Sequence, residues 1–169
     1  VDVAFPDEVT LLEGLRAGDA AAFRGLVELN SANVYNIALK LLADEHEAED
    51  VLQETFLSAF EAIARFEGRS KLSTWLYRIA YNASLMRLRK RKQMTSFSLD
   101  SPPGEDDETL ASPSRHLVDW TAVPDDQLLT TEAREEMDRA IAELPETLRS
   151  TFVLRDIQGL SGIETAEVL

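Results

Sequence analysis

Residues 74–92, TWLYRIAYNASLMRLRKRK, combine apolar residues at helical spacing with a dense run of basic side chains. Six cations lie between Arg78 and Lys92 without an acid among them, although the chain of 169 residues carries 17 basic and 31 acidic side chains, a net charge of -14. So local a positive charge in an acidic protein predicts that one surface meets a polyanion. An ordinary solvated helix face is the alternative explanation for such a cluster.

The positive charge is confined to one segment of the chain. Residues 60–92 hold nine bases and two acids, whereas residues 1–59 and 93–139 each hold 12 acids and three bases. A basic island between acidic flanks predicts a polyanion on one surface and other kinds of partner elsewhere.

A helix predicted over residues 72–92 places an apolar stripe beside a polar one. Leu72, Leu76, Ile79 and Ala83 point in one direction and form the predicted core stripe, with Met86 at its edge. The neighbouring direction holds cations, an indole and an amide, with Lys92 at its border. We call this set the basic face: Lys71, Trp75, Arg78, Asn82, Arg89 and Lys92.

The basic face has the chemistry of a surface for opened nucleic acid. Cations match phosphates, an amide pairs with a base edge, and tryptophan stacks on an unpaired base. A partly buried core aromatic is the alternative for Trp75. The preceding loop extends the surface with Arg65, Phe66, Arg69 and Ser70.

The remaining pattern predicts an all-α protein, because no window alternates with period two over the length of a strand. Helices are expected from Asp7 to Gly18, from Asp19 to about Leu42, and from Asp44 to about Ala64. With the helix over 72–92 they form a four-helix bundle over residues 1–92. Asp44 followed by Glu47 is a capping pair for the third helix.

A long acidic linker and a second helical unit follow. Residues 93–124 contain four prolines and many serines, which predicts a spacer or plain disorder. Over 125–169 we expect a helix to about Ala142, a second helix from Pro145 to Gly159, and a third that opens at the Ser161 capping box. This arrangement is typical of the start of a helix-turn-helix, whose second helix is expected after Leu169.

Composition narrows the class of protein further. The chain has no cysteine, so disulfides and thiolate metal sites are excluded. The start VDVAFPDEV has no signal-peptide pattern, and no apolar run is long enough to span a membrane. We therefore expect a cytoplasmic protein without a membrane partner. Glycine loops that cradle phosphate are missing too, which argues against a nucleotide-dependent enzyme.

Three elements, in order and properly spaced, resemble one family. They are D-x-x-Q-E-T-F within residues 50–56, T-W-L-Y-R-I-A-x-N within 74–82, and L-P-x-x-x-R within 144–149. The chain resembles the bacterial extracytoplasmic-function (group 4) RNA polymerase sigma factors. The resemblance implies sigma region 2 over residues 1–92 and the start of region 4 over 125–169, truncated within the helix-turn-helix.

The resemblance also implies roles for residues. Asp50, Gln53 and Glu54, at i, i+3 and i+4 on one helical face, would bind the clamp coiled coil of the polymerase largest subunit. The loop FEGRSK and the following helix would recognise and open the promoter −10 element, holding flipped bases of the non-template strand without any hydrolysis. The residues expected on DNA are Arg65, Phe66, Arg69, Ser70, Lys71, Trp75, Arg78, Asn82, Arg89 and Lys92.

Further partners follow from the same resemblance. The linker would run through the RNA path of the polymerase, and the second unit would contact the β-subunit flap and −35 DNA. An anti-sigma factor is a further partner of this family. Many relatives carry an aspartate where this chain has Met86, from which we infer a difference in helix packing or promoter preference. No catalytic residue, cofactor or metal is expected.

Two other functions compete with this interpretation. A metal-dependent hydrolase could use DEHEAED, residues 44–50, but its single His46 has no second histidine at i+4. A capped, solvated helix start explains that cluster more simply. A non-enzymatic helical adaptor could bind an acidic partner through its basic helix, and it would show no preference among DNA bases. A membrane-binding helix would need a larger apolar face.

Overall fold

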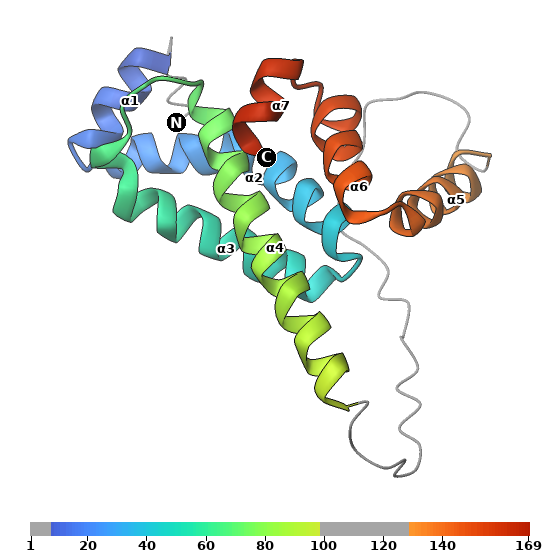
Figure 1. The fold of residues 1–169 in the computed structure, drawn as a ribbon. Helices are drawn as coiled ribbons and strands as arrows, with labels where there is room; N and C mark the ends of the chain where they lie inside the picture. The colour runs from blue at the N-terminus through green and yellow to red at the C-terminus, as the bar shows by residue number, and fades with distance from the viewer. Residues whose placement is uncertain (1–7, 99–128) are drawn as a thin grey trace.

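The computed structural model describes residues 8–98 and 129–169, and all regular secondary structure in these two ranges is helical (Figure 1). This confirms the predicted all-α class. The helices are α1 (Glu8–Arg16), α2 (Ala20–Leu42), α3 (Glu45–Ala62), α4 (Leu72–Ser98), α5 (Leu129–Glu143), α6 (Glu146–Phe152) and α7 (Gly162–Val168), with a 3-10 turn η1 (Ile63–Arg65) and a π-helical turn η2 (Val153–Ile157).

The helix starts follow the capping residues of the sequence. The Asp19 carboxylate accepts a hydrogen bond from the Ala21 amide at 2.8 Å, and Asp44 accepts one from the Glu47 amide at 2.9 Å. These bonds satisfy amides that the first helical turn leaves without partners. The start of α4 is stabilised from a distance, because the Leu72 amide donates to Glu8 Oε1 of α1 at 2.6 Å. No local pattern could predict that last contact.

The first four helices form the α1–α4 bundle, residues 8–98, around one apolar core. α4 packs against both α2 and α3, and its Leu76 is fully buried. The predicted core stripe is confirmed for Leu72, Leu76 and Ala83, while Ile79 is half-buried. Met86 at its predicted edge is 67% exposed.

The buried surface of α4 is wider than one stripe, because neighbouring helices cover it from several sides. Tyr77, Ala80 and Tyr81 are also buried. The Tyr77 hydroxyl accepts a hydrogen bond from Asn33 of α2 at 2.9 Å, so the phenol keeps a polar partner at the core edge.

Several predicted boundaries differ from those observed. α4 continues to Ser98, so residues 93–98, assigned to the linker from their sequence, are helical. The basic run has no helix breaker at its end, and the polar residues after it continue the helix. α3 ends at Ala62 and passes into η1. The predicted cap Asp7, the rest of the linker (99–124) and the predicted helix start at 125–128 lie outside the described residues.

Residues 129–169 contain three further α-helices, α5 to α7, which together we call the C-terminal unit. α6 continues directly into η2, and Gly159 at a φ of 69° reverses the chain before α7. The predicted capping box at α7 is confirmed: Ser161 Oγ accepts from the Glu164 amide at 3.2 Å, and Glu164 Oε2 accepts from the Ser161 amide at 2.9 Å. The buried apolar residues of this unit belong to the same hydrophobic cluster as the core of the α1–α4 bundle; they are Ile141, Val153, Leu154, Leu160 and Val168.

The C-terminal unit packs on the α1–α4 bundle (Figure 1). α7 lies against α4, and α5, α6 and η2 contact α2. Half-buried Arg149 of α6 joins the two bodies: its guanidinium donates to the Leu41 carbonyl of α2 at 3.2 Å, to the Leu144 carbonyl at 3.0 Å, and to the Ala142 carbonyl. The Leu41 carbonyl at the end of α2, which has no partner within the helix, thereby gains a charged donor.

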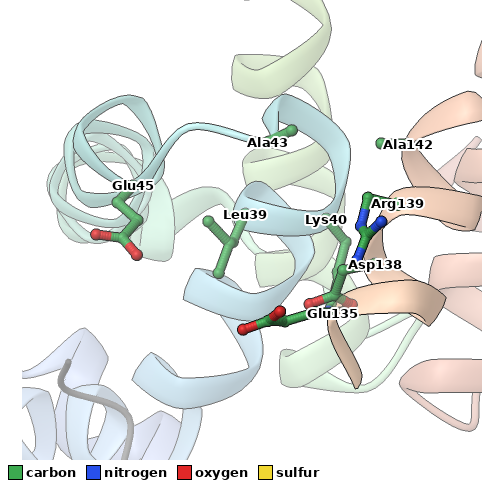
Figure 2. A pocket seen from close by; sticks show the side chains of 8 residues that line it. All are labelled: Leu39, Lys40, Ala43, Glu45, Glu135, Asp138, Arg139 and Ala142. Carbon is green, nitrogen blue, oxygen red and sulfur yellow. Dashed lines mark hydrogen bonds and ion pairs between the residues drawn. The ribbon is translucent and has the colours of Figure 1, made fainter. Parts of the chain in front are cut away.

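A pocket of about 460 Å³ lies at this junction, between the C-terminal half of α2 and α5 (Figure 2). Lys40 of α2 and Asp138 of α5 form an ion pair at its wall. Because both bodies contribute to its lining, the pocket has this shape only while they are packed together. Its lining residues are Leu39, Lys40, Ala43, Glu45, Glu135, Asp138, Arg139 and Ala142.

Candidate nucleic-acid interface

The middle of the basic face lies open to solvent. Arg78, Asn82 and Arg89 are exposed on α4, on the side turned away from buried Leu76 and Ala83. The structure therefore brings two cations and an amide together on one exposed surface. Such groups can bind phosphates and base edges.

The aromatic residues of the predicted site are less accessible. The rings of Trp75 and Phe66 pack with their centroids 5.0 Å apart, and Phe66 is only 7% exposed. Trp75 is half-buried, so the alternative of a partly buried aromatic describes its packing, while part of its indole still reaches solvent. The carbonyl of Phe66 accepts a hydrogen bond from Arg16 at 2.6 Å, which ties the loop to α1.

The loop before α4 presents the other predicted residues. Arg65 and Arg69 are exposed, and Ser70 is half-buried. Arg69 pairs with Glu67 at 2.6 Å, but both side chains are largely exposed, so a phosphate could replace that carboxylate. Gly68 has a φ of 72°, a left-handed conformation that a side chain would strain.

Both ends of the basic face contact acids of the C-terminal unit. Lys71 Nζ lies 2.7 Å from Glu164 Oε1 of α7, and Lys92 Nζ lies 2.5 Å from Glu146 Oε2 of α6. The hydrogen bond to Glu164 raises the pKa of Lys71. The sequence could not predict these pairs, because their partners are separated by more than 50 positions along the chain.

The same carboxylate is expected to make the stability of α7 sensitive to acid. The Lys71 side chain, followed by the Ser161 backbone and hydroxyl, lowers the pKa of Glu164 from 4.5 to about 2. A lowered pKa in the folded state adds stability above the usual pKa, and this stability is lost as the pH falls toward the folded-state value. The melting temperature of the wild type should exceed that of Glu164→Gln at neutral pH.

Thermal unfolding of both proteins across a pH series measures this effect. The difference in melting temperature should stay constant from about pH 7 to about pH 5 and shrink below the usual pKa of the carboxyl. A difference that is unchanged down to about pH 3 would contradict a paired Glu164.

The predicted acidic face of α3 already has a basic partner within the protein. Arg87 of α4 contacts Asp50 Oδ2 at 3.3 Å and Glu54 Oε2 at 3.1 Å. Both carboxylates remain half or more exposed, so a partner protein can still reach them. Arg91 pairs with Glu47 in the same way. The sequence showed the acids on one face, but not that α4 supplies cations to it.

Gln53 faces a different environment from its two acidic neighbours. It lines an apolar groove of about 570 Å³ between α3 and the start of α2. Phe23 and Phe60 pack there with ring centroids 4.7 Å apart, while Leu57 and Phe60 stay 66% and 59% exposed. We name this surface the α3 groove; its lining residues are Gly18, Ala20, Phe23, Gln53, Phe56, Leu57 and Phe60.

Sequence reasoning missed the α3 groove, although the signal was present. Phe56, Leu57 and Phe60 give α3 an apolar stripe wider than one core contact requires. Clustered exposed apolar side chains of this size mark an interaction surface.

Other kinds of site find less support among the described residues. Over 8–98 and 129–169, no three His, Cys, Asp or Glu side chains are grouped so that they could hold a metal ion. Across the same residues, every helix is too short or too polar to cross a membrane.

The chain is similar to proteins of known name. Residues 26–94 match the family described as Sigma-70 region 2. The chain is 34% identical over 159 residues to the ECF RNA polymerase sigma factor SigW of Bacillus subtilis (strain 168), covering 94% of this chain and 82% of that protein. It is 32% identical to the ECF RNA polymerase sigma-E factor of Escherichia coli (strain K12), covering 94% and 81%.

A solved structure has a similar fold. CnrH, in complex with the cytosolic domain of CnrY, matches with a TM-score of 0.63 at 20% identity, over 95% of this chain and 81% of that chain. The alignment therefore includes both the α1–α4 bundle and most of the C-terminal unit.

Proposed function

Because this chain belongs to the extracytoplasmic-function RNA polymerase sigma factors, which direct RNA polymerase to promoters, we propose that its α1–α4 bundle works through two separate surfaces. The basic face of α4 binds and opens the promoter −10 element, and α3 binds core polymerase. The observation that supports this division most directly is the exposed set Arg78, Asn82 and Arg89, which lies on α4 apart from the α3 groove.

On the α3 side, the proposed partner is the clamp coiled coil of the largest polymerase subunit. A helix can lay apolar side chains into the α3 groove. Asp50 and Glu54 at its edge would accept hydrogen bonds from arginines of the partner, in exchange for or together with Arg87. Gln53 connects the two parts of this surface, since it lines the groove and lies one helical turn from Asp50.

On the α4 side, the proposed ligand is the non-template strand of the −10 element. Arg78 and Arg89 would bind phosphates, and Asn82 would pair with a flipped base. The half-buried Trp75 offers an edge or part of a face for stacking, with Phe66 as its support. Trapping unpaired bases offsets the few kcal/mol that unstacking costs.

The other parts of the chain are assigned by the same family relation. We place sigma region 2 in the part of the chain that ends with α4 at Ser98, a linker in 99–124 that follows the RNA path, and region 4 sequence in 125–169, which would contact the β-subunit flap. An anti-sigma factor could bind these same surfaces. The protein would then work in the cytoplasm, where bacterial RNA polymerase transcribes DNA.

Variants on the two surfaces should separate the two activities. Asn82→Ala should weaken promoter opening by about 1–3 kcal/mol, the usual contribution of a base contact, and leave polymerase binding intact. Trp75→Ala should act in the same direction. The double variant Gln53→Ala with Leu57→Ala should weaken polymerase binding without changing DNA contacts, and it leaves the Arg87 ion pairs in place.

The measurements are the affinity for core polymerase and the opening of a promoter by the assembled holoenzyme. Asp50→Ala with Gln53→Ala should weaken polymerase binding as well. Glu13→Ala, an exposed acid on α1, serves as the control and should change neither activity. Equal loss of both activities in the α3 and α4 variants would contradict two separate surfaces. A preference for one −10 sequence would exclude the adaptor alternative.

A further inference from the structure

In each ion pair described between the α1–α4 bundle and the C-terminal unit, the bundle supplies the cation and the C-terminal unit supplies the carboxylate. Lys40, Lys71 and Lys92 of the α1–α4 bundle supply the cations, and Asp138, Glu164 and Glu146 of the C-terminal unit supply the carboxylates. A bundle surface suited to nucleic acid is thus contacted at its ends by a unit whose residues 140–169 hold five acids and two bases.

Two of these pairs lie at opposite ends of the basic face. Lys71 precedes α4 and Lys92 lies 21 positions later, a separation of about 30 Å along a helix. Both lysines belong to the surface proposed to bind DNA. A carboxylate and a phosphate offer a lysine the same kind of charge-assisted hydrogen bond. At both ends of the basic face, the C-terminal unit therefore engages a lysine that a DNA phosphate would otherwise bind.

Packing places the C-terminal unit over this helix as well. α7 contacts α4 directly, and its Thr165 and Val168 are buried. A DNA strand following the basic face toward Lys71 would meet α7 and the Glu164 carboxylate. Covalent connection through the linker keeps the unit close to α4 after it detaches, so it competes at a high effective concentration.

The ion pairs themselves are weak enough to exchange. The Lys71 and Lys92 side chains are 67% and 71% exposed, and water and salt screen ion pairs at such sites, so each pair stabilises the packing only slightly. A single-stranded DNA, with a negative charge at every nucleotide and the gain from counterion release, can displace two such carboxylates.

We propose that the C-terminal unit is an internal competitor of DNA: in the free chain Glu146 and Glu164 engage the two ends of the basic face, and the unit moves off α4 when DNA binds. This inference rests on the proposed role of the basic face in DNA binding. It adds that the affinity of the free chain for DNA is set partly by its own C-terminal carboxylates.

The test compares two double variants of the full chain that remove the same charge. Glu146→Gln with Glu164→Gln removes both competing carboxylates, and glutamine at the capping position still serves a capping box. Glu143→Gln with Glu167→Gln removes two exposed acids of the same unit that make no ion pair with the bundle in the described structure. The probe is a single-stranded DNA of mixed sequence, about 12 nucleotides long.

The first variant should bind this DNA roughly 3- to 10-fold more tightly than the second, the change expected from one to two surface ion pairs. Circular dichroism of both variants checks that the helices are intact. Equal affinities would overturn the competition and leave the proposed DNA contacts standing. No binding by the wild type or by either variant would instead contradict the proposed DNA-binding role of the basic face, and the competition with it.

A distance measurement provides a second readout. The chain has no cysteine, so Val9→Cys in α1 and Ile163→Cys in α7, at positions 66% and 77% exposed, can carry the only spin labels. Saturating DNA should lengthen and broaden the distance between the labels. A distance distribution that is unchanged while DNA is bound would overturn the proposed movement.

Discussion

Leu76→Ala is expected to lower the free energy of unfolding by about 2–5 kcal/mol, the largest effect of any single change considered for this chain. Leu76 is fully buried near the start of α4, a helix that packs against both α2 and α3. Truncation removes its apolar contacts and leaves a cavity that the closely packed helices can fill only in part. Since α4 carries the basic face, the loss would extend to the DNA-binding surface.

Urea unfolding followed by circular dichroism measures this loss. Met86→Ala is the matched control, because it lies on the same helix but is 67% exposed. It should change the free energy of unfolding by less than about 0.5 kcal/mol. Similar losses in the two variants would contradict the position of Leu76 at the core and of Met86 at the surface.

Arg149→Met should weaken the packing of the C-terminal unit on the bundle by about 2–3 kcal/mol. The Arg149 guanidinium serves carbonyls of Leu41, Ala142 and Leu144, and methionine fills part of the volume without a donor. The carbonyls would lose a charged partner in a half-buried place. The Arg149 Nε is itself buried without a hydrogen-bond partner, a cost that the substitution removes and that limits the net loss.

Two further variants define the cause. Arg149→Lys keeps the charge but cannot reach three carbonyls with a planar fork, so most of the loss should remain. Arg155→Met removes an exposed arginine of the same unit and should have little effect. The label distance between α1 and α7 reports the packing in each variant. Full packing in Arg149→Met would show that the remaining apolar contacts and ion pairs hold the C-terminal unit in place without Arg149.

Local features of this protein followed from its sequence because they depend on neighbouring residues. The caps at Asp19 and Asp44 and the Ser161 capping box satisfy amides within the next turn. The apolar spacing of Leu72, Leu76 and Ala83 identified the buried side of α4. The helical class, the family and the position of the basic face on α4 could all be predicted at this level.

Contacts between distant segments could not be read in this way. The pairing of Arg87 with Asp50 and Glu54, the anchoring of α6 on α2 by Arg149, and the meeting of Lys71 with Glu164 join residues 33 to 108 positions apart. Such partners are chosen by how whole helices pack, and a surface lysine or arginine has the same local pattern whether or not an acid faces it.

The sequence by itself determined that the chain is helical, where its helices begin, and which side of α4 carries the basic residues. Only the tertiary structure decided which of those residues are open to a ligand and which are already engaged, because burial and ion pairing depend on the arrangement of complete helices. Arg78, Asn82 and Arg89 are exposed, whereas Lys71 and Lys92 hold carboxylates of the chain's own C-terminal unit.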